Sequence, residues 1–283
     1  MQKLSRISVH SIGAAMALLS LAIVGCGAGA EVTAVKVEGT PGIQGSQWFA
    51  PGPEHRIDVS HTIDAAGSRH VAVQAVNGSI VVEPGSGSEV SIQAHVRVRA
   101  PSLSEAQELA DQVEVRIAQH GDTIAIEPVY PRLPRGYQVD VQFELECPQH
   151  MALDLSATNG SMHVSGIEGA LQLATRNGNI ETTLSQLSKP GSFTTTNGSI
   201  QIVVDRGEAS LDAATTNGTI EVELPASFRG TFDGATTTGR VRSEFELGNR
   251  TGNSRHLQGA IGSGGPATVL LRATNGDIRL EKR

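Results

Sequence analysis

The chain has 283 residues and a formal net charge of −7, from 22 Lys and Arg against 29 Asp and Glu. No basic run follows the N-terminal segment and aromatic residues make up 3% of the chain, so we expect no nucleic-acid partner and no stacking platform for bases or sugars. Gly is abundant at 32 residues and charged residues are sparse at 18%, which is typical of an all-β protein with many turns.

The first 25 residues have the pattern of an export signal. Lys3 and Arg6 give a positive start, and residues 12–24 are apolar or small apart from one serine. This stretch is shorter than the about 20 apolar residues that a transmembrane helix needs. It ends in Ile-Val-Gly-Cys26, which resembles the lipobox of bacterial lipoproteins. The resemblance implies a signal peptide over 1–25 and a diacylglycerol on the sulfur of Cys26, with the membrane as partner. The alternatives are an ordinary signal peptide with an accidental cysteine, or a short membrane anchor.

A stretch rich in Gly, Pro and Ser follows Cys26 and predicts a flexible tether over 26–55. Gly27 is not the Asp that resembles an inner-membrane retention signal. We therefore expect an exported protein, lipid-anchored in the cell envelope, in the outer membrane or facing the periplasm if the host is Gram-negative. Cys147 is the only other cysteine, so a lipidated Cys26 leaves it unpaired and the domain must fold without disulfides. We expect Cys147 to be a small hydrophobe rather than a nucleophile.

Residues 56–155 predict a β-rich N-terminal part with one helix. Apolar and polar residues alternate in several runs, which is the pattern of strands with one buried face. Residues 103–113 have helical spacing instead, and Ser102 with Glu105 three residues later forms a capping-box pattern. We expect this part to cover the open end of the repeat that follows, where an unpaired strand edge would invite aggregation.

Residues 156–283 repeat a Thr-x-Asn-Gly-x-Ile motif between alternating strands. Successive glycines are 18, 20, 20, 21 and 37 residues apart, and the last gap holds an insertion rich in Gly, Asn and Ser at about 248–266. One isolated copy lies earlier in the chain. The predicted turn residues are Asn77, Gly78, Asn159, Gly160, Asn177, Gly178, Asn197, Gly198, Asn217, Gly218, Gly239, Asn275 and Gly276.

Two architectures fit these turns. Asn-Gly between alternating strands is a strong hairpin signal and would give an antiparallel meander. A near-constant spacing of 20 residues favours a β-solenoid with two strands per coil, in which each coil stacks on its predecessor. Ile180, Ile200 and Ile220 would then stack inside, and Thr and Asn side chains would form ladders. In one copy Thr238 takes the Asn position, and a β-branched residue at φ > 0 is an outlier. Either that coil uses a different turn, or only the glycine needs the left-handed region.

No catalytic, metal or cofactor site is predicted. The nine His residues are scattered without Cys or carboxylate pairs at ligand spacing, and no Gly-rich turn leads into a helix. The enzyme alternative is a carbohydrate-active solenoid, because Glu181, Gln201 and Glu221 fall at equivalent positions. Stacked coils would place Glu181 and Glu221 about 9.6 Å apart, within the range of an inverting carboxylate pair. The competing interpretation is a solvated polar face, since no aromatic subsites flank the row.

Residues 70–283 resemble the bacterial putative-adhesin family, a domain of unknown function. The likeness is carried by Val76-Asn77-Gly78-Ser79-Ile80, the helix start from Ser102 to Ala106, Gly121-Asp122, the repeated Thr-x-Asn-Gly-x-Ile, and the ending from Gly264 to Leu271 followed by Thr274-Asn275-Gly276. The resemblance implies a β-solenoid and surface attachment, and it supplies no catalytic residues.

The sequence therefore predicts a membrane-anchored envelope lipoprotein whose residues 56–283 form one continuous adhesin-like domain. We expect a non-enzymatic binding or adhesion module that takes a protein or glycan ligand on the solenoid surface, without cofactor or metal. The alternative is an envelope-stress or structural accessory protein that docks on another envelope protein.

Overall fold

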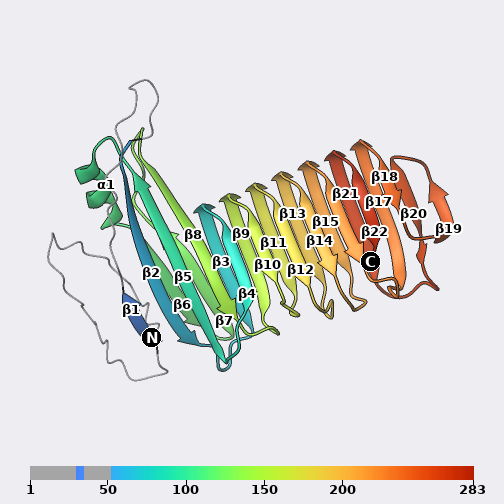
Figure 1. The fold of residues 1–283 in the computed structure, drawn as a ribbon, viewed down its shortest axis with the longest axis horizontal. Helices are drawn as coiled ribbons and strands as arrows, with labels where there is room; N and C mark the ends of the chain where they lie inside the picture. Colours follow the sequence, from blue (N-terminus) through green and yellow to red (C-terminus); the bar gives the residue numbers. More distant parts are fainter. Residues whose placement is uncertain (1–29, 35–51) are drawn as a thin grey trace.

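The computed structural model describes residues 30–34 and 52–283. They form two sheets of 11 strands each, sheet A and sheet B, which wind into an elongated solenoid with one helix, α1 (Leu103–Ala110), at its N-terminal end (Figure 1). The predicted all-β solenoid is confirmed. The expected signal peptide and Cys26 lie outside the described residues. In the described ranges no helix is long and apolar enough to cross a membrane.

The strands of each sheet stack along the long axis of the molecule. Sheet A contains, in spatial order, β19 (Leu247–Gly252), β20 (His256–Ile261), β17 (Gly230–Thr238), β21 (Thr268–Asn275), β15 (Leu211–Asn217), β13 (Gly191–Asn197), β11 (Leu171–Asn177), β9 (Ala152–Asn159), β3 (His70–Asn77), β7 (Thr123–Val129) and β6 (Glu114–His120). Sheet B contains β1 (Ala30–Ala34), β2 (Glu54–Asp64), β5 (Glu89–Arg99), β8 (Gln138–Cys147), β4 (Ile80–Pro84), β10 (Met162–Ser165), β12 (Ile180–Leu184), β14 (Ile200–Val204), β16 (Ile220–Leu224), β22 (Ile278–Lys282) and β18 (Val241–Ser243).

Each Asn-Gly pair forms a corner between the two sheets and not a hairpin turn. The strand before the pair lies in sheet A and the strand after it lies in sheet B, as β11 and β12 do. Both pair in parallel with their copies in neighbouring coils, with Asn177 opposite Asn197 and Ile180 opposite Ile200. The meander is therefore wrong. Because the chain passes from one sheet to the other at each corner, every strand lies beside the equivalent strand of the neighbouring coil, and equivalent residues face one another.

The core is a stack of equivalent apolar side chains between the sheets. Ile180, Ile200 and Ile220 lie in register and are fully buried, as predicted. The same column continues through Met162 and Ile278. Because every residue of the column is flanked by its copies above and below, apolar surface is removed from water along the whole axis.

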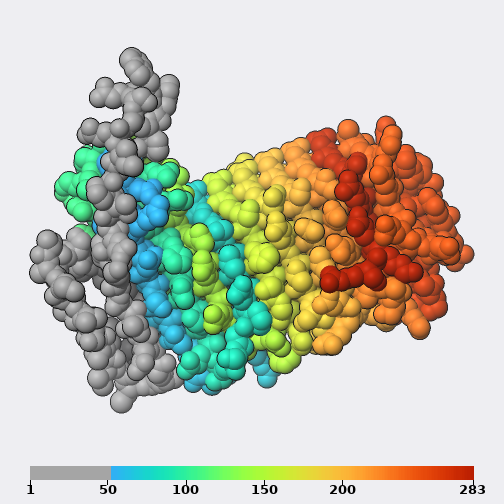
Figure 2. All heavy atoms as spheres, in the orientation of Figure 1, coloured from blue at the N-terminus to red at the C-terminus, as the bar shows by residue number. Residues whose placement is uncertain are grey.

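The C-terminal coils do not stack in chain order. The strands β21 and β22 insert between the coil of β15 and β16 and the coil of β17 and β18, so the coil containing Thr238 becomes the outer one. Figure 2 shows the red C-terminal residues lying between orange ones. The insertion at 248–266 is no simple loop, because β19 and β20 form a hairpin that pairs antiparallel with β17. We had expected each coil to stack on its predecessor. Asn275 continues the asparagine column, whereas Thr238 cannot.

The N-terminal part differs from the prediction at its start. The expected tether over 26–55 contains β1, which pairs antiparallel with β2, and β2 itself begins at Glu54. Pairing with β1 covers a strand that would otherwise present an open edge. The capping box is confirmed, since the Ser102 hydroxyl accepts a hydrogen bond from the Glu105 amide at 3.3 Å. The helix ends at Ala110, three residues earlier than its apolar spacing suggests, and β6 follows.

Two histidines on the inward face of β2 are buried without hydrogen bonds. His55 and His61 are 3% and 4% exposed. Both ring nitrogens of His55 and Nδ1 of His61 lack a partner among the described residues. Burial lowers the pKa of both imidazoles below the ordinary 6.5, and Asp111 at the end of α1 opposes this in part at His55. The folded protein therefore holds both rings neutral where the unfolded chain would protonate them.

We expect the stability contributed by these neutral rings to be complete above pH 6.5 and to fall as the pH drops below that value. The unfolded state binds more protons than the folded state in the window between the ordinary pKa and the lowered one. Urea unfolding across this window measures the slope. The double variant His55→Leu, His61→Leu should flatten it, and an unchanged slope in that variant would show that other groups cause it.

Candidate binding face

The asparagines of the Asn-Gly corners form a continuous ladder of side-chain amides. Each amide nitrogen donates to the carboxamide oxygen of the next coil toward the N-terminus. The five bonds, Asn275 to Asn217, Asn217 to Asn197, Asn197 to Asn177, Asn177 to Asn159 and Asn159 to Asn77, measure 2.7–2.8 Å. Asn77 closes the ladder by donating to the carbonyl of Val139 at 3.2 Å. We define these six residues as the corner ladder.

The glycines of the corners let the coils approach. A Cβ on Gly198 would lie 1.9 Å from the carbonyl oxygen of Gly178, and a Cβ on Gly178 would lie 2.1 Å from that of Gly160. In the described residues Asn249 is the one non-glycine with positive φ, so Thr238 keeps an ordinary conformation. The coil of Thr238 uses the same corner as most others, because Gly239 has a positive φ of 145°. The second explanation holds only in part, since Gly160 and Gly198 do not have a positive φ. What all the corner glycines share is the close approach of the neighbouring coil. Buried threonines complete the corner, as Thr195 donates to the carbonyl of Gly178 at 3.0 Å.

Close stacking makes the outer side of sheet A a regular surface with a shallow groove across it. The groove has a volume of about 600 Å³ and crosses six neighbouring strands near their N-terminal ends, which corresponds to about 24 Å at the usual strand spacing. Its lining residues come from β3, β9, β11, β13, β15 and β21 and the positions just before them. They are His70, Ala152, Leu153, Asp154, Ala170, Leu171, Gln172, Pro190, Gly191, Ser192, Ser210, Leu211, Asp212, Thr268 and Leu270.

A row of polar side chains without hydrogen-bond partners among the described residues runs along this groove. Asp154, Gln172, Ser192 and Asp212 occupy equivalent positions on four successive strands. None of these side chains has a hydrogen-bond or ion-pair partner among the described residues. Small residues such as Ala170 leave the space in front of the row open. The row offers carboxylate, amide and hydroxyl groups to an outside ligand, and the lining carries no Lys or Arg.

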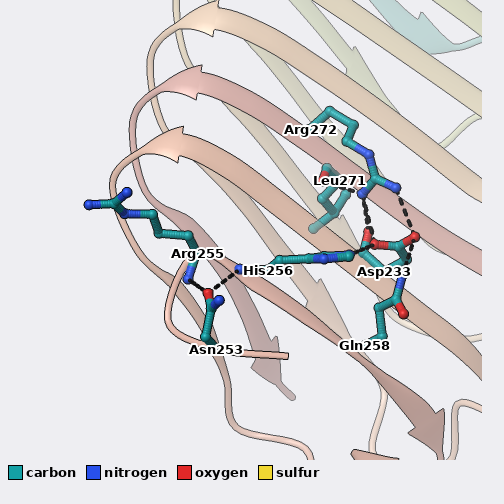
Figure 3. Close-up of polar contacts among 7 residues, drawn as sticks. All are labelled: Asp233, Asn253, Arg255, His256, Gln258, Leu271 and Arg272. Carbon is teal, nitrogen blue, oxygen red and sulfur yellow. Dashed lines mark hydrogen bonds and ion pairs between the residues drawn. The ribbon is translucent and has the colours of Figure 1, made fainter. Parts of the chain in front are cut away.

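A polar cluster at the C-terminal end of the same face fastens the last hairpin to the solenoid (Figure 3). Asp233 of β17 receives two hydrogen bonds from the Arg272 guanidinium, at 2.8 and 3.0 Å. Gln258 and His256 of β20 contact the same carboxylate at 2.9 and 3.1 Å. Burial alone would raise the pKa of Asp233, but the hydrogen bonds from Arg272, Gln258 and His256 outweigh it and lower that pKa. The carboxylate thus bridges three strands.

Asp233→Ala is expected to lower the unfolding free energy by about 1–2 kcal/mol, because charge-assisted hydrogen bonds are lost at a partly exposed site. Since the pKa of Asp233 is lowered on folding, this contribution is present above the ordinary value of 3.8 and disappears as the pH falls through the folded value. Amide exchange should accelerate in β20 and not in β11. Asp212→Ala, at an unpartnered carboxylate of the same face, is the matched control, and an equal loss there would refute the bridging role.

The outer side of sheet B carries the predicted carboxylate row. Glu181, Gln201 and Glu221 lie in register on β12, β14 and β16, as expected. Each glutamate faces a basic neighbour, with His163 at 3.6 Å from Glu181 and Arg279 at 3.8 Å from Glu221. Contacts to separate neighbours favour a solvated polar face over two carboxylates that share one substrate.

Sequence reasoning missed a second acidic cluster on this side. One carboxylate oxygen each of Glu221, Glu223 and Glu281 lie within 4.8 Å of one another. Burial, followed by the charges of Glu221, Glu244 and Glu223, raises the pKa of Glu281. The cluster forms because β22 stacks directly on β16, which places Glu281 beside Glu223. Both coils contain Ile-x-x-Glu, and this shared pattern could have indicated the cluster. The two glutamates become neighbours, however, only in the stacking order that the sequence did not predict.

The two cysteines are the remaining residues for which the sequence predicts a role. Cys26, the expected lipid attachment residue, lies outside the described residues. Cys147 is fully buried at the end of β8 with a free thiol, and burial raises its pKa to about 12, so it is an inert small hydrophobe as expected.

A family model described as Toastrack DUF4097 matches residues 140–281. A putative cell adhesion protein from Clostridium sporogenes is 12% identical with a TM-score of 0.41, covering 80% of this chain and 99% of that one. A putative adhesin from Bacteroides fragilis is 9% identical with a TM-score of 0.40, covering 79% of this chain and 96% of that one. No curated protein matches the chain. The family match extends from β8 to β22.

Proposed function

We propose that this chain, which belongs to the Toastrack DUF4097 family, is a lipid-anchored, non-enzymatic, adhesin-like module of the cell envelope. The groove on the outer side of sheet A is its binding site, and the ligand is an extended glycan. Cys26 holds the module on the membrane, so the protein works outside the cytoplasm. The observation that carries this proposal is the row of unpartnered polar side chains in the groove.

The direction of the groove favours a glycan over a polypeptide. Extended peptides commonly bind by adding a strand to a sheet edge, where backbone groups are unpaired. Here the groove crosses strands whose backbone groups are already paired with their neighbours on both sides. A ligand must therefore be held by side chains, and the carboxylate, amide and hydroxyl groups of Asp154, Gln172 and Ser192 suit sugar hydroxyls.

The charge of the groove narrows the class of glycan. Asp154 and Asp212 carry negative charge, and the lining contains no Lys or Arg. An acidic polysaccharide would be repelled, whereas a neutral or amino-sugar polymer would not. The lining has no aromatic side chain for stacking, so we expect modest affinity for one site and dependence on several sugar units along the groove.

Probing glycan, peptidoglycan and matrix-protein arrays with the purified protein tests this function. We expect binding to neutral or amino-sugar chains that are long enough to span the groove, and weak binding to their short fragments. Binding to proteins alone would replace the glycan with a protein partner. No binding in any class, together with unchanged attachment of cells that lack the gene, would overturn the proposal.

A further inference from the structure

Six of the nine asparagines in the chain are followed by glycine, and all six belong to the corner ladder. The fold demands both residues, the asparagine for its carboxamide bonds and the glycine for close approach. Asparagine is a thermolabile residue, and a following glycine leaves its backbone nitrogen unhindered for attack on the asparagine side chain. The corners therefore concentrate the dipeptide that is most prone to spontaneous deamidation.

The reaction needs no partner other than water. The glycine backbone nitrogen forms a bond to Cγ of the preceding asparagine, and the bond from Cγ to Nδ2 breaks. Ammonia leaves and carries away the proton of the glycine amide, which yields a succinimide ring. Water then opens the ring at either carbonyl and gives aspartate or isoaspartate. The attack requires an amide that is free to lose its proton and a carboxamide that is free to rotate toward it.

Stacking of the coils restrains both the glycine amide and the asparagine carboxamide. The Gly178 amide donates to the Asn197 carbonyl at 3.0 Å, and the Gly198 amide donates to the Asn217 carbonyl at 2.9 Å. The corresponding amides of the other four corners are bonded in the same way. In the interior of the ladder each carboxamide is also held on both sides, since it donates to one neighbour and accepts from the other.

The two ends of the corner ladder are not equivalent. At the N-terminal end Asn77 donates to Val139 and accepts from Asn159, so it is held on both sides. At the other end Asn275 donates to Asn217, but the next coil offers Thr238 in its place. The carboxamide oxygen of Asn275 accepts no hydrogen bond from any described residue, and β18 beyond it is only three residues long.

We propose that the corner ladder protects its Asn-Gly pairs from deamidation in the folded protein, and that Asn275 is the residue modified first. Loss of the amide at Asn275 removes its donor and leaves an acid oxygen facing the carboxamide oxygen of Asn217. Two acceptors cannot bond, so Asn217 becomes the new loose end. Modification proceeds inward from the C-terminal end of the ladder, one coil at a time.

The test compares conversion at each site by peptide mapping after incubating the purified protein at mildly alkaline pH, either folded or in urea. In urea all six sites should convert. In the folded protein the interior sites should convert at least about 100-fold more slowly, since they require local opening, and Asn275 should convert fastest. Interior sites that react as fast folded as unfolded would overturn the proposal.

A variant extends the test to the end of the ladder. Thr238→Asn places a carboxamide next to Asn275, so conversion at Asn275 should slow and position 238 should become the first site modified. Thr237→Asn is the matched control, because this exposed neighbour is not the residue that lies opposite Asn275. Conversion at Asn275 that is equally fast in wild type and Thr238→Asn would show that the free end does not determine the order.

Discussion

Gly198→Ala is expected to destabilise the protein by about 3 kcal/mol or more, an unusually large effect for adding one methyl group. The new Cβ would lie 1.9 Å from the carbonyl oxygen of Gly178 and 2.6 Å from its carbonyl carbon. Both atoms belong to backbone that is fixed by the neighbouring coil, so no side chain can move aside. Relief requires the coils of Gly178 and Gly198 to separate, which lengthens the bond from the Gly178 amide to the Asn197 carbonyl.

This position isolates close approach from backbone strain, because Gly198 does not have a positive φ in the left-handed region. Urea unfolding of the variant measures the loss. Gly87→Ala is the matched control, since a Cβ there would meet nothing closer than 3.8 Å. We expect that control to remain within about 0.5 kcal/mol of wild type. Equal stabilities of the two variants would refute the role of close approach at the corners.

Cys26→Ser is expected to release the protein from membranes completely. The two acyl chains of a diacylglycerol anchor a protein stably, whereas the hydroxyl of serine does not accept the diacylglycerol in place of the cysteine sulfur. Incorporation of labelled fatty acid and fractionation of membranes measure the two effects. Cys147→Ala serves as the control, since its thiol is buried and unreactive, and it should keep both label and membrane attachment. If the Cys26→Ser protein stays membrane-bound and unprocessed, the first segment is a plain anchor.

Much of the fold was predictable because the repeat obeys local rules. The alternation around Ile180, Ile200 and Ile220 identifies strands and their buried faces, and a spacing of 20 residues indicates stacking. The order of the last coils was not predicted, because stacking on a neighbour depends on which coil can continue the corner ladder. Asn275 donates its amide to Asn217 and continues the carboxamide ladder, for which Thr238 has no amide, and the later coil takes the inner place. The sequence does show this difference, because the copy at Thr238-Gly239 lacks the asparagine of the repeated motif.

The candidate binding face was less predictable than the fold. The positions of Asp154, Gln172 and Ser192 in adjacent coils follow from the repeat, but the groove depends on small residues before each strand, such as Ala170 and Pro190. These lie in connections whose length varies between coils, and periodicity does not fix them. Likewise the Asp233 cluster depends on the hairpin of β19 and β20, which the sequence showed only as an insertion rich in Gly, Asn and Ser.

The most direct measurement of the proposed function is binding of a groove-filling variant to the glycan that the array identifies. Ser192→Trp places a large ring in the middle of the groove, while Thr183→Trp places the same ring at an exposed position on the opposite sheet. We predict that Ser192→Trp weakens binding at least 10-fold, or about 1.4 kcal/mol, and that Thr183→Trp binds like wild type. Unchanged affinity for Ser192→Trp, or an equal loss for Thr183→Trp, would contradict a binding site in the groove of sheet A.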